Sequence, residues 1–173
     1  MIPSGGGGKD WAGISVPESF GSLPGCLRML LGLDGTLTRS LAFLSGSPVT
    51  VEPVRLPDSM TEIRKVFLSV SGQGRLVFAR TRLLPSSESR ADPWIEELLK
   101  GGEAIGQSME TRYGPLLKDE FAIFSVSGVF DSDCAPEGKV TWARSYRMRT
   151  SGGIGLRIEE FFLPALGRLL ERE

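Results

Sequence analysis

One carboxylate near the end of the chain stands on the apolar face of a predicted strand. Residues 154–164 alternate between apolar and polar side chains, which is typical of a β-strand with one buried face. Glu160 falls on the same face as Ile154, Leu156, Ile158 and Phe162. An unpartnered carboxylate is costly to bury. Either the strand's register differs from this pattern, or Glu160 meets an arginine, or it faces a ligand cavity.

An arginine has the same kind of position in the strand predicted just before. Over residues 139–149, Arg144 shares a face with Val140, Trp142, Tyr146 and Met148. A turn at 150–153 would place this strand beside the one that carries Glu160. An ion pair between Arg144 and Glu160 on one buried face is the simplest structural interpretation. Contact with a bound anion is the functional one.

Two more arginines lie inside the strand predicted over residues 74–84. Arg80 and Arg82 share a face, and both faces of this segment are largely apolar, so we expect a central strand. A guanidinium group matches a carboxylate in a bidentate manner and keeps its charge when desolvated. Periodicity does not choose between the two, and one of them could be a solvated edge arginine. With Arg144 and Glu160, they predict an anion-binding cavity walled by a sheet and capped by helices.

The residue types exclude several kinds of chemistry. The chain has no histidine, and its two cysteines, Cys26 and Cys134, are not in a CxxC motif. These facts exclude Ser–His and Cys–His catalysis, histidine-ligated zinc and an imidazole general base. The glycine-rich segments lack the spacing of a phosphate-binding loop. We therefore expect no metal site, and any enzyme chemistry must use carboxylates, arginines, hydroxyls and backbone groups.

Charge and hydropathy limit the partners and the location. A net charge of −1 gives no basic field that would favour nucleic acid. No apolar run approaches the roughly 20 residues of a membrane-spanning helix. The short apolar stretch at 26–31 is too far from the start for a signal peptide. We expect a cytoplasmic protein that binds neither nucleic acid nor membrane, and that is a monomer or a weak dimer.

The remaining elements predict an α+β fold. Residues 1–22, which include four consecutive glycines, are expected to form a flexible tail, and residues 23–173 a single domain. Helices are predicted at 24–31, 36–44, 93–100 and 103–112, and strands at 48–55, 62–71, 74–84, 121–130, 139–149 and 154–163. The order favours a six-stranded antiparallel sheet with helices packed on one face, because strict alternation of strands and helices is missing.

Three segments resemble the chorismate pyruvate-lyase family. They are Phe78–Pro85, with the letters FARTRLLP; Trp142–Gly152, with WARSYRMRTSG; and Glu160–Pro164, with EFFLP. Weaker likeness covers 33–38 and 104–106. The order and spacing of these segments run from about residue 30 to Pro164, which is most of the chain.

The resemblance implies a chorismate lyase-like fold and the conversion of chorismate to 4-hydroxybenzoate and pyruvate without metal or organic cofactor. It implies that Arg80 is a substrate-binding and catalytic arginine and that Glu160 is the active-site glutamate. Leu37 and the Ile105–Gly106 backbone match positions that contact the ligand. Three residues, rather than two, separate Thr81 from Pro85, which leaves Arg80 and Arg82 as alternatives.

The chemistry suits these residue types. Chorismate is a dianion, and elimination of pyruvate with aromatisation needs positioning and stabilisation of charge on the leaving enolate. Arg80 could hold a carboxylate and the ether oxygen, Glu160 could orient or deprotonate the substrate, and Arg144 or Arg147 could support the second carboxylate. The product would supply quinone or phenolic precursors.

Two other functions stay open. One is a non-catalytic sensor of small aromatic acids, and the other is a related chorismate-using enzyme that gives another hydroxybenzoate. The charged run from Glu110 to Glu120 is expected to be a solvated helix end and loop, which could also form a flap over the cavity.

Overall fold

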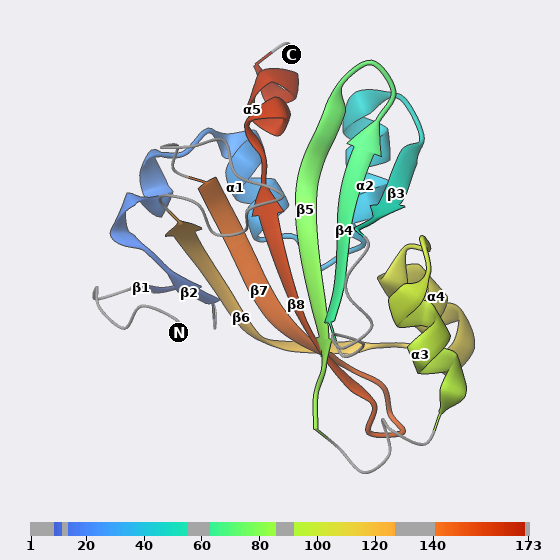
Figure 1. The fold of residues 1–173 in the computed structure, drawn as a ribbon. Helices are drawn as coiled ribbons and strands as arrows, with labels where there is room; N and C mark the ends of the chain where they lie inside the picture. The colour runs from blue at the N-terminus through green and yellow to red at the C-terminus, as the bar shows by residue number, and fades with distance from the viewer. Residues whose placement is uncertain (1–8, 12–13, 55–62, 86–91, 127–140, 172–173) are drawn as a thin grey trace.

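The computed structural model describes residues 9–11, 14–54, 63–85, 92–126 and 141–171. The strands of this described part form one sheet in the order β1-β2-β6-β7-β8-β5-β4-β3 (Figure 1). They are β1 (Lys9–Trp11), β2 (Ile14–Val16), β3 (Val49–Pro53), β4 (Ile63–Val70), β5 (Gly74–Leu83), β6 (Leu117–Val126), β7 (Thr141–Arg149) and β8 (Gly155–Phe162).

Strands β3 to β8 form a continuous antiparallel sheet, so the predicted six antiparallel strands are confirmed. The turn signals explain the hairpins. Gly72 and Gly74 have positive φ angles of 74° and 79° between β4 and β5, and Gly153 has one of 84° between β7 and β8. Only glycine adopts such angles without steric cost. The short strand β2 extends the sheet by a parallel contact with β6, where Ser15 is the register partner of Ala122.

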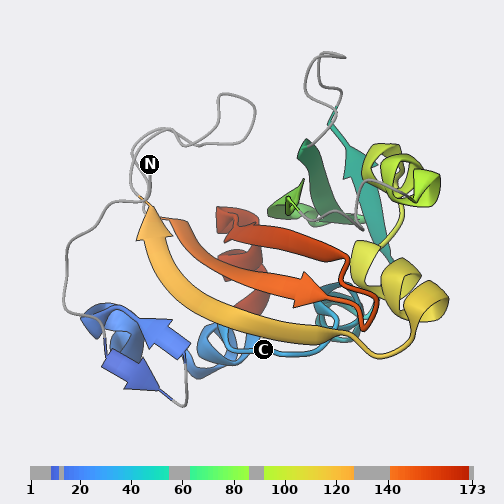
Figure 2. The same ribbon diagram turned by 90° about the horizontal axis from the view of Figure 1, so that it is seen from below.

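The helices pack on one face of the antiparallel sheet. They are the 3₁₀ helix η1 (Glu18–Ser22), α1 (Gly25–Leu31), α2 (Leu37–Ser45), α3 (Pro93–Lys100), α4 (Ile105–Tyr113) and α5 (Pro164–Leu170). Figure 1 shows α1 and α2 behind the sheet, and Figure 2 shows the curved layer of β6, β7 and β8 with α3 and α4 together at one end. Asp92 caps α3, because its side chain accepts a hydrogen bond from the Trp94 amide at 3.0 Å.

Alternation along β8 shows which side chains meet the helices. Phe162 belongs to a core cluster with residues of α1, α2 and α5, and Ile158 belongs to a second cluster with residues of α3 and α4. Phe161 instead packs with Phe67 and Phe78 in a third cluster. We call the side of Ile158 and Phe162 the helix face, and the side of Phe161 the opposite face. Among the described residues, the predicted packing of helices on one face is confirmed.

Strand β6 begins at Leu117, earlier than the predicted residue 121, and contains a bulge. Asp119 pairs with Arg147 and Ala122 pairs with Ser145, so the register shifts between them. Glu120 lies in the bulge with a φ of 50°, which is unusual for a residue with a side chain. Residues 127–130, which were predicted to continue this strand, and Cys134 lie outside the described residues.

The predicted flexible tail requires a correction. Residues 1–8 lie outside the described part, but Val16 on β2 is 3% exposed and Phe20 in η1 is 6% exposed. The Phe20 ring lies 6.5 Å from the Trp142 ring, measured between centroids. Both buried residues belong to the core cluster with α1, α2 and α5. The segment from Ile14 to Ser22 is therefore part of the fold, and its elements are too short to show a hydrophobic period.

This assignment predicts a clear stability difference. Phe20→Ala should lower the free energy of unfolding by about 3 kcal/mol, because it removes a buried ring and leaves a cavity. Phe43→Ala on α2, where the ring is 82% exposed, should change it by less than about 0.5 kcal/mol. Urea unfolding followed by circular dichroism measures both. Equal effects would mean that residues 14–22 do not contribute to the core.

Candidate ligand cavity

A cavity of about 190 Å³ lies between the helix face of the sheet and the first turns of α2 and α4. Its floor comes from β4, β5, β7 and β8. The floor residues are Val66, Leu68, Ala79, Thr81, Tyr146, Met148, Ile158 and Glu160. The rim comes from the loop and helix start at 34–38, from residues 103–106, and from Arg64, Glu110 and Lys118. An apolar floor with polar groups around its edge is the usual composition of a small-molecule site.

Glu160 lines this cavity and is also paired with Arg144. The residue is 6% exposed, and its Oε2 accepts a hydrogen bond from Arg144 Nε at 2.5 Å. The Tyr146 hydroxyl donates to Oε1 at 3.4 Å. Two of the predicted explanations therefore hold together, because the carboxylate has a buried arginine partner and faces a cavity. Burial raises the pKa of the Tyr146 hydroxyl far above its ordinary value, so this phenol stays protonated.

Arg144 does not line the cavity but holds the structure behind it. Its side chain is fully buried, and Nη1 donates to the carbonyl oxygens of Leu30 at 2.8 Å and Leu33 at 2.6 Å. These carbonyls lie at the end of α1, where helix geometry leaves acceptors without partners. The expected ion pair with Glu160 is present, whereas direct contact with a ligand is not supported. Arg144 thus joins β7, β8 and the chain segment that leads to the cavity rim.

The predicted placement of Arg80 at the ligand site is not supported, because Arg80 lies on the opposite face of the sheet. Across β5 and β8 the register pairs Ala79 with Glu160 and Arg80 with Glu159. The Arg80 Nη2 atom forms an ion pair with Glu159 Oε2 at 3.0 Å, and its guanidinium lies 5.1 Å from the Phe161 ring centroid. Arg80 and Glu160 therefore do not face one guest.

The alternative arginine, Arg82, is excluded by the same geometry. Residues two apart on a strand share a face, so Arg82 lies with Arg80 on the opposite face. The residue between them, Thr81, is 2% exposed and lines the cavity. The cavity floor thus has a hydroxyl where the resemblance implies a guanidinium.

Arg147 also lies away from the cavity. On the opposite face, its Nε donates to Asp119 Oδ1 at 2.7 Å, and its Nη1 lies 2.9 Å from Glu120 Oε1. The hydrogen bond from Arg147, with a further one from Arg149, holds the pKa of the Asp119 carboxyl below its ordinary value. The predicted role of Arg147 with a ligand carboxylate at this site is not supported, since odd-numbered residues of β7 point away from the helices.

Leu37, Ile105 and Gly106 are brought together at the rim, as the resemblance implies. Leu37 begins α2 and Ile105 begins α4, and neither helix has a side-chain cap hydrogen bond at its N-cap residue. Uncapped first turns leave backbone N–H groups that favour negative charge. Two helix starts therefore bring partial positive charge to one side of the cavity.

Arg64 is a functional candidate that the sequence interpretation missed. It is 4% exposed; its Nε donates to the Gly101 carbonyl at 3.2 Å and its Nη2 to the Glu103 carbonyl at 2.5 Å. Nη1 has no hydrogen-bond partner among the described residues. Burial lowers the pKa of Arg64 to about 10, and the charge of Glu103 opposes that shift. Arg64 shares a face with Val66 and Leu68, which is the same signal that identified Glu160.

Lys118 closes the rim from the start of β6. Its Nζ donates to the backbone carbonyls of Asp34 and Gly35, the latter at 3.2 Å. Burial lowers the pKa of this amine, and the charge of Asp34 opposes that shift. Lys118 belongs to the charged run at 110–120, which the sequence predicts to be solvated. The pattern of that run gives no direction for an individual side chain. Lys118 contacts the loop at 34–35 on the cavity rim, and a flap over the cavity, the alternative to a solvated run, stays a prediction.

Comparison with known proteins gives little further guidance. No protein-family model matches the sequence, and no curated protein matches it either. Six chains among the solved structures match it in fold. One is YydK from Bacillus subtilis, described as a possible transcriptional regulator, with a TM-score of 0.43, 13% identity and coverage of 69% of this chain and 60% of that chain.

Another of these structures is described as the ligand-binding domain of a candidate GntR-family transcriptional regulator from Bordetella bronchiseptica. It has a TM-score of 0.38 and 12% identity, and the match covers 68% of this chain and 84% of that one. This chain spans about 60% of the length of the Bacillus protein. At these scores neither likeness carries weight for function, so function has to be inferred from the cavity.

Two further findings concern the described residues as a whole. No described helix combines the length and apolar character needed to cross a bilayer. Groups of three or more cysteine, aspartate, glutamate or histidine side chains that could hold a metal ion are not found in this part of the chain.

The buried pair gives a stability prediction. Arg144→Met should lower the free energy of unfolding by about 3 kcal/mol or more, because Glu160 and the α1 carbonyls lose their partner. Arg144→Met combined with Glu160→Leu should recover part of this loss, since no unpaired buried charge remains. Arg39→Met, at an exposed position on α2, is the matched control. A double variant no more stable than Arg144→Met, in urea unfolding, would contradict the assignment.

Proposed function

We propose that the cavity binds a small single-ring carboxylate of the hydroxybenzoate class. The observation that carries this proposal is Arg64, which lines the cavity and whose Nη1 atom donates no hydrogen bond to a described residue. A buried arginine with a spare donor favours an incoming carboxylate, because the fork of the guanidinium matches it. The uncapped starts of α2 and α4 add to the attraction.

The size of the cavity supports one ring. An apolar cavity of roughly 150 Å³ accommodates benzene, and this cavity has about 190 Å³. Drug-sized ligands use cavities of about 300 Å³ or more. A benzoate with one small substituent therefore suits the volume, and the apolar floor around Met148 and Ile158 suits its ring faces.

The opposite charges of Arg64 and Glu160 suggest an orientation for the ligand. They lie two strands apart and two residues apart along the strands, which corresponds to roughly 12 Å between their Cα atoms. Arg64 would take the ring carboxylate, and Glu160 would accept a hydrogen bond from a ring hydroxyl. Because Arg144 already neutralises Glu160, a second anionic group near Glu160 is not excluded by charge.

Chorismate lyase activity is the second candidate. The observation that favours it is the convergence of Glu160, Leu37, Ile105 and Gly106 on one cavity. In this proposal the protein is cytoplasmic, acts without cofactor as a monomer or weak dimer, and supplies 4-hydroxybenzoate for quinone or phenolic precursors. Arg64, rather than Arg80, would hold a carboxylate of chorismate. Without turnover, the same cavity would serve as a sensor of aromatic acids.

Ligand binding tests the first candidate. Wild-type protein should bind 4-hydroxybenzoate in isothermal titration calorimetry, and Arg64→Leu should weaken binding at least about tenfold, because a charge-assisted hydrogen bond is lost. Arg64→Lys keeps the charge without the fork and should bind with intermediate affinity. Arg168→Leu, at an exposed position on α5, is the matched control and should bind like wild type. Binding that is absent in wild type, or equal in both leucine variants, would contradict the proposal.

Turnover tests the second candidate. Incubation with chorismate in the presence of a chelator should release pyruvate and 4-hydroxybenzoate. Glu160→Gln should reduce kcat about a hundredfold or more if its carboxylate handles a proton. Arg80→Ala should keep the wild-type rate, because Arg80 lies on the opposite face. Tight binding of 4-hydroxybenzoate without turnover identifies a sensor. A different hydroxybenzoate isomer as product identifies the related enzyme. A turnover rate that falls in Arg80→Ala would place the active site outside this cavity.

A further inference from the structure

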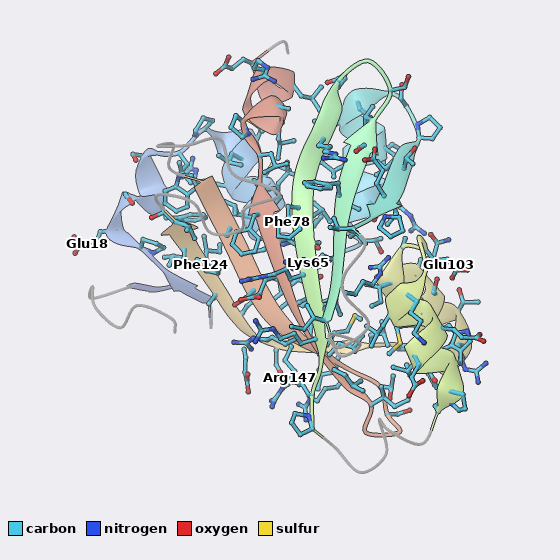
Figure 3. The ribbon with its side chains drawn as sticks, viewed as in Figure 1. Glu18, Lys65, Phe78, Glu103, Phe124 and Arg147 are labelled. Atoms are coloured by element: carbon cyan, nitrogen blue, oxygen red, sulfur yellow. The ribbon has the colours of Figure 1, made fainter. Side chains whose placement is uncertain are left out.

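Three arginines lie side by side across the sheet on the face away from the cavity. The register pairs Arg82 on β5 with Arg157 on β8, and Arg157 with Arg147 on β7. We call these residues the arginine row. Figure 3 labels Arg147, where nitrogen-bearing side chains gather beside the crossing of the strands. Strand spacing gives the row a length of roughly 10 Å.

This arrangement is electrostatically unusual. Cross-strand neighbours of like charge are destabilising, since their Cβ atoms are only about 5 Å apart. The sheet places two such contacts in succession. The chain as a whole has a net charge of −1, so the row is a local concentration of positive charge. Such a concentration has a cost in the free protein that a bound anion would relieve.

The protein neutralises part of the row through the β6 bulge. Glu120 Oε2 lies 2.9 Å from Arg157 Nη1, and its Oε1 lies 2.9 Å from Arg147 Nη1. Glu120 has a positive φ in the bulge, and its carboxylate lies between Arg147 and Arg157. Asp119 adds a second carboxylate, which accepts from both Arg147 and Arg149.

Arg82 is left without neutralisation. It is exposed, and among the described residues its side chain has no ion pair or hydrogen bond. Two flanking arginines add unused donors, because the buried Nε atoms of Arg80 and Arg149 have no hydrogen-bond partner in the described part of the chain. The group therefore has more guanidinium donors than its own carboxylates accept.

We propose that the arginine row binds a compact ligand that carries two or three phosphoryl groups. A phosphoryl group presents three strong acceptor oxygens and up to two charges, so it competes with the tethered carboxylates better than a single carboxylate does. The fork of arginine matches its geometry. Arg82 provides the first contact, and Arg157 and Arg147 can shift partners from Glu120 to the ligand.

Larger polyanions fit less well. Nucleic acid binding relies on contacts to many phosphates in succession, whereas this row is short and is flanked by Glu159 and Asp119. Single strands also stack bases on aromatic rings. On this face Phe78 and Phe161 are 0% and 2% exposed, and Phe124 is half-buried against them. Attraction to anionic lipid requires larger clusters of basic residues without interspersed acids.

Calorimetry with inorganic pyrophosphate tests this site. Wild-type protein should bind it at low ionic strength, and Arg82→Ala should weaken binding about tenfold or more. Arg168→Ala, on α5, is the matched control and should bind like wild type. Glu120→Gln should tighten binding, because it removes the competing carboxylate and keeps the side-chain size. Glu96→Gln on α3 makes the same charge change elsewhere and should leave the affinity unchanged.

Citrate and 4-hydroxybenzoate complete the test. Citrate, a carboxylate polyanion, should bind more weakly than pyrophosphate. Arg82→Ala should keep wild-type affinity for 4-hydroxybenzoate, so failure at the row is distinguishable from failure at the cavity. The proposal is overturned if pyrophosphate does not bind at millimolar concentration, if Arg82→Ala and Arg168→Ala bind it equally, or if citrate, RNA or an acidic peptide binds better.

Discussion

The ion pair between Arg144 and Glu160 is the constraint on which the cavity depends. A buried guanidinium and a buried carboxylate are each unfavourable alone, so β7 and β8 must keep the register that places them together. The same guanidinium reaches the last carbonyls of α1 at Leu30 and Leu33. One side chain therefore fixes a helix end relative to the sheet, and the next residues along the chain form the cavity rim. Lys118 ties that rim to β6 by a second set of hydrogen bonds.

This pairing also decides the electrostatics of the site. Because Arg144 neutralises Glu160, the carboxylate can remain at the cavity wall without making the whole site repel anions. Arg64 is then the arginine that lines the cavity, and the starts of α2 and α4 add partial positive charge at the rim. The result is a small apolar space with a cationic side and a hydrogen-bond acceptor. Such a space suits a ring with a carboxylate and a hydroxyl group.

Periodicity predicted much of the fold and part of the site. Period-two patterns identified six strands, and they placed Arg144 and Glu160 on one face, because a face is a local property of each strand. They could not relate Arg80 to Glu160, since that requires the register between β5 and β8. Arg64 carried the same signal as Glu160 and could have been found. The position of Lys118 could not be predicted, because it depends on a strand with a bulge. The helix η1 could not be predicted either, because it is too short to show a hydrophobic period.

The two faces of the sheet thus have separate electrostatic roles, with a buried pair beside a cavity on one and an arginine row on the other. A crystal structure with 4-hydroxybenzoate tests the central claim most directly. We expect the ring above Ile158 and Met148, with its carboxylate within hydrogen-bond distance of Arg64 Nη1. A ligand seated instead against Arg80 on the opposite face, or a cavity that stays empty at saturating ligand, would contradict it.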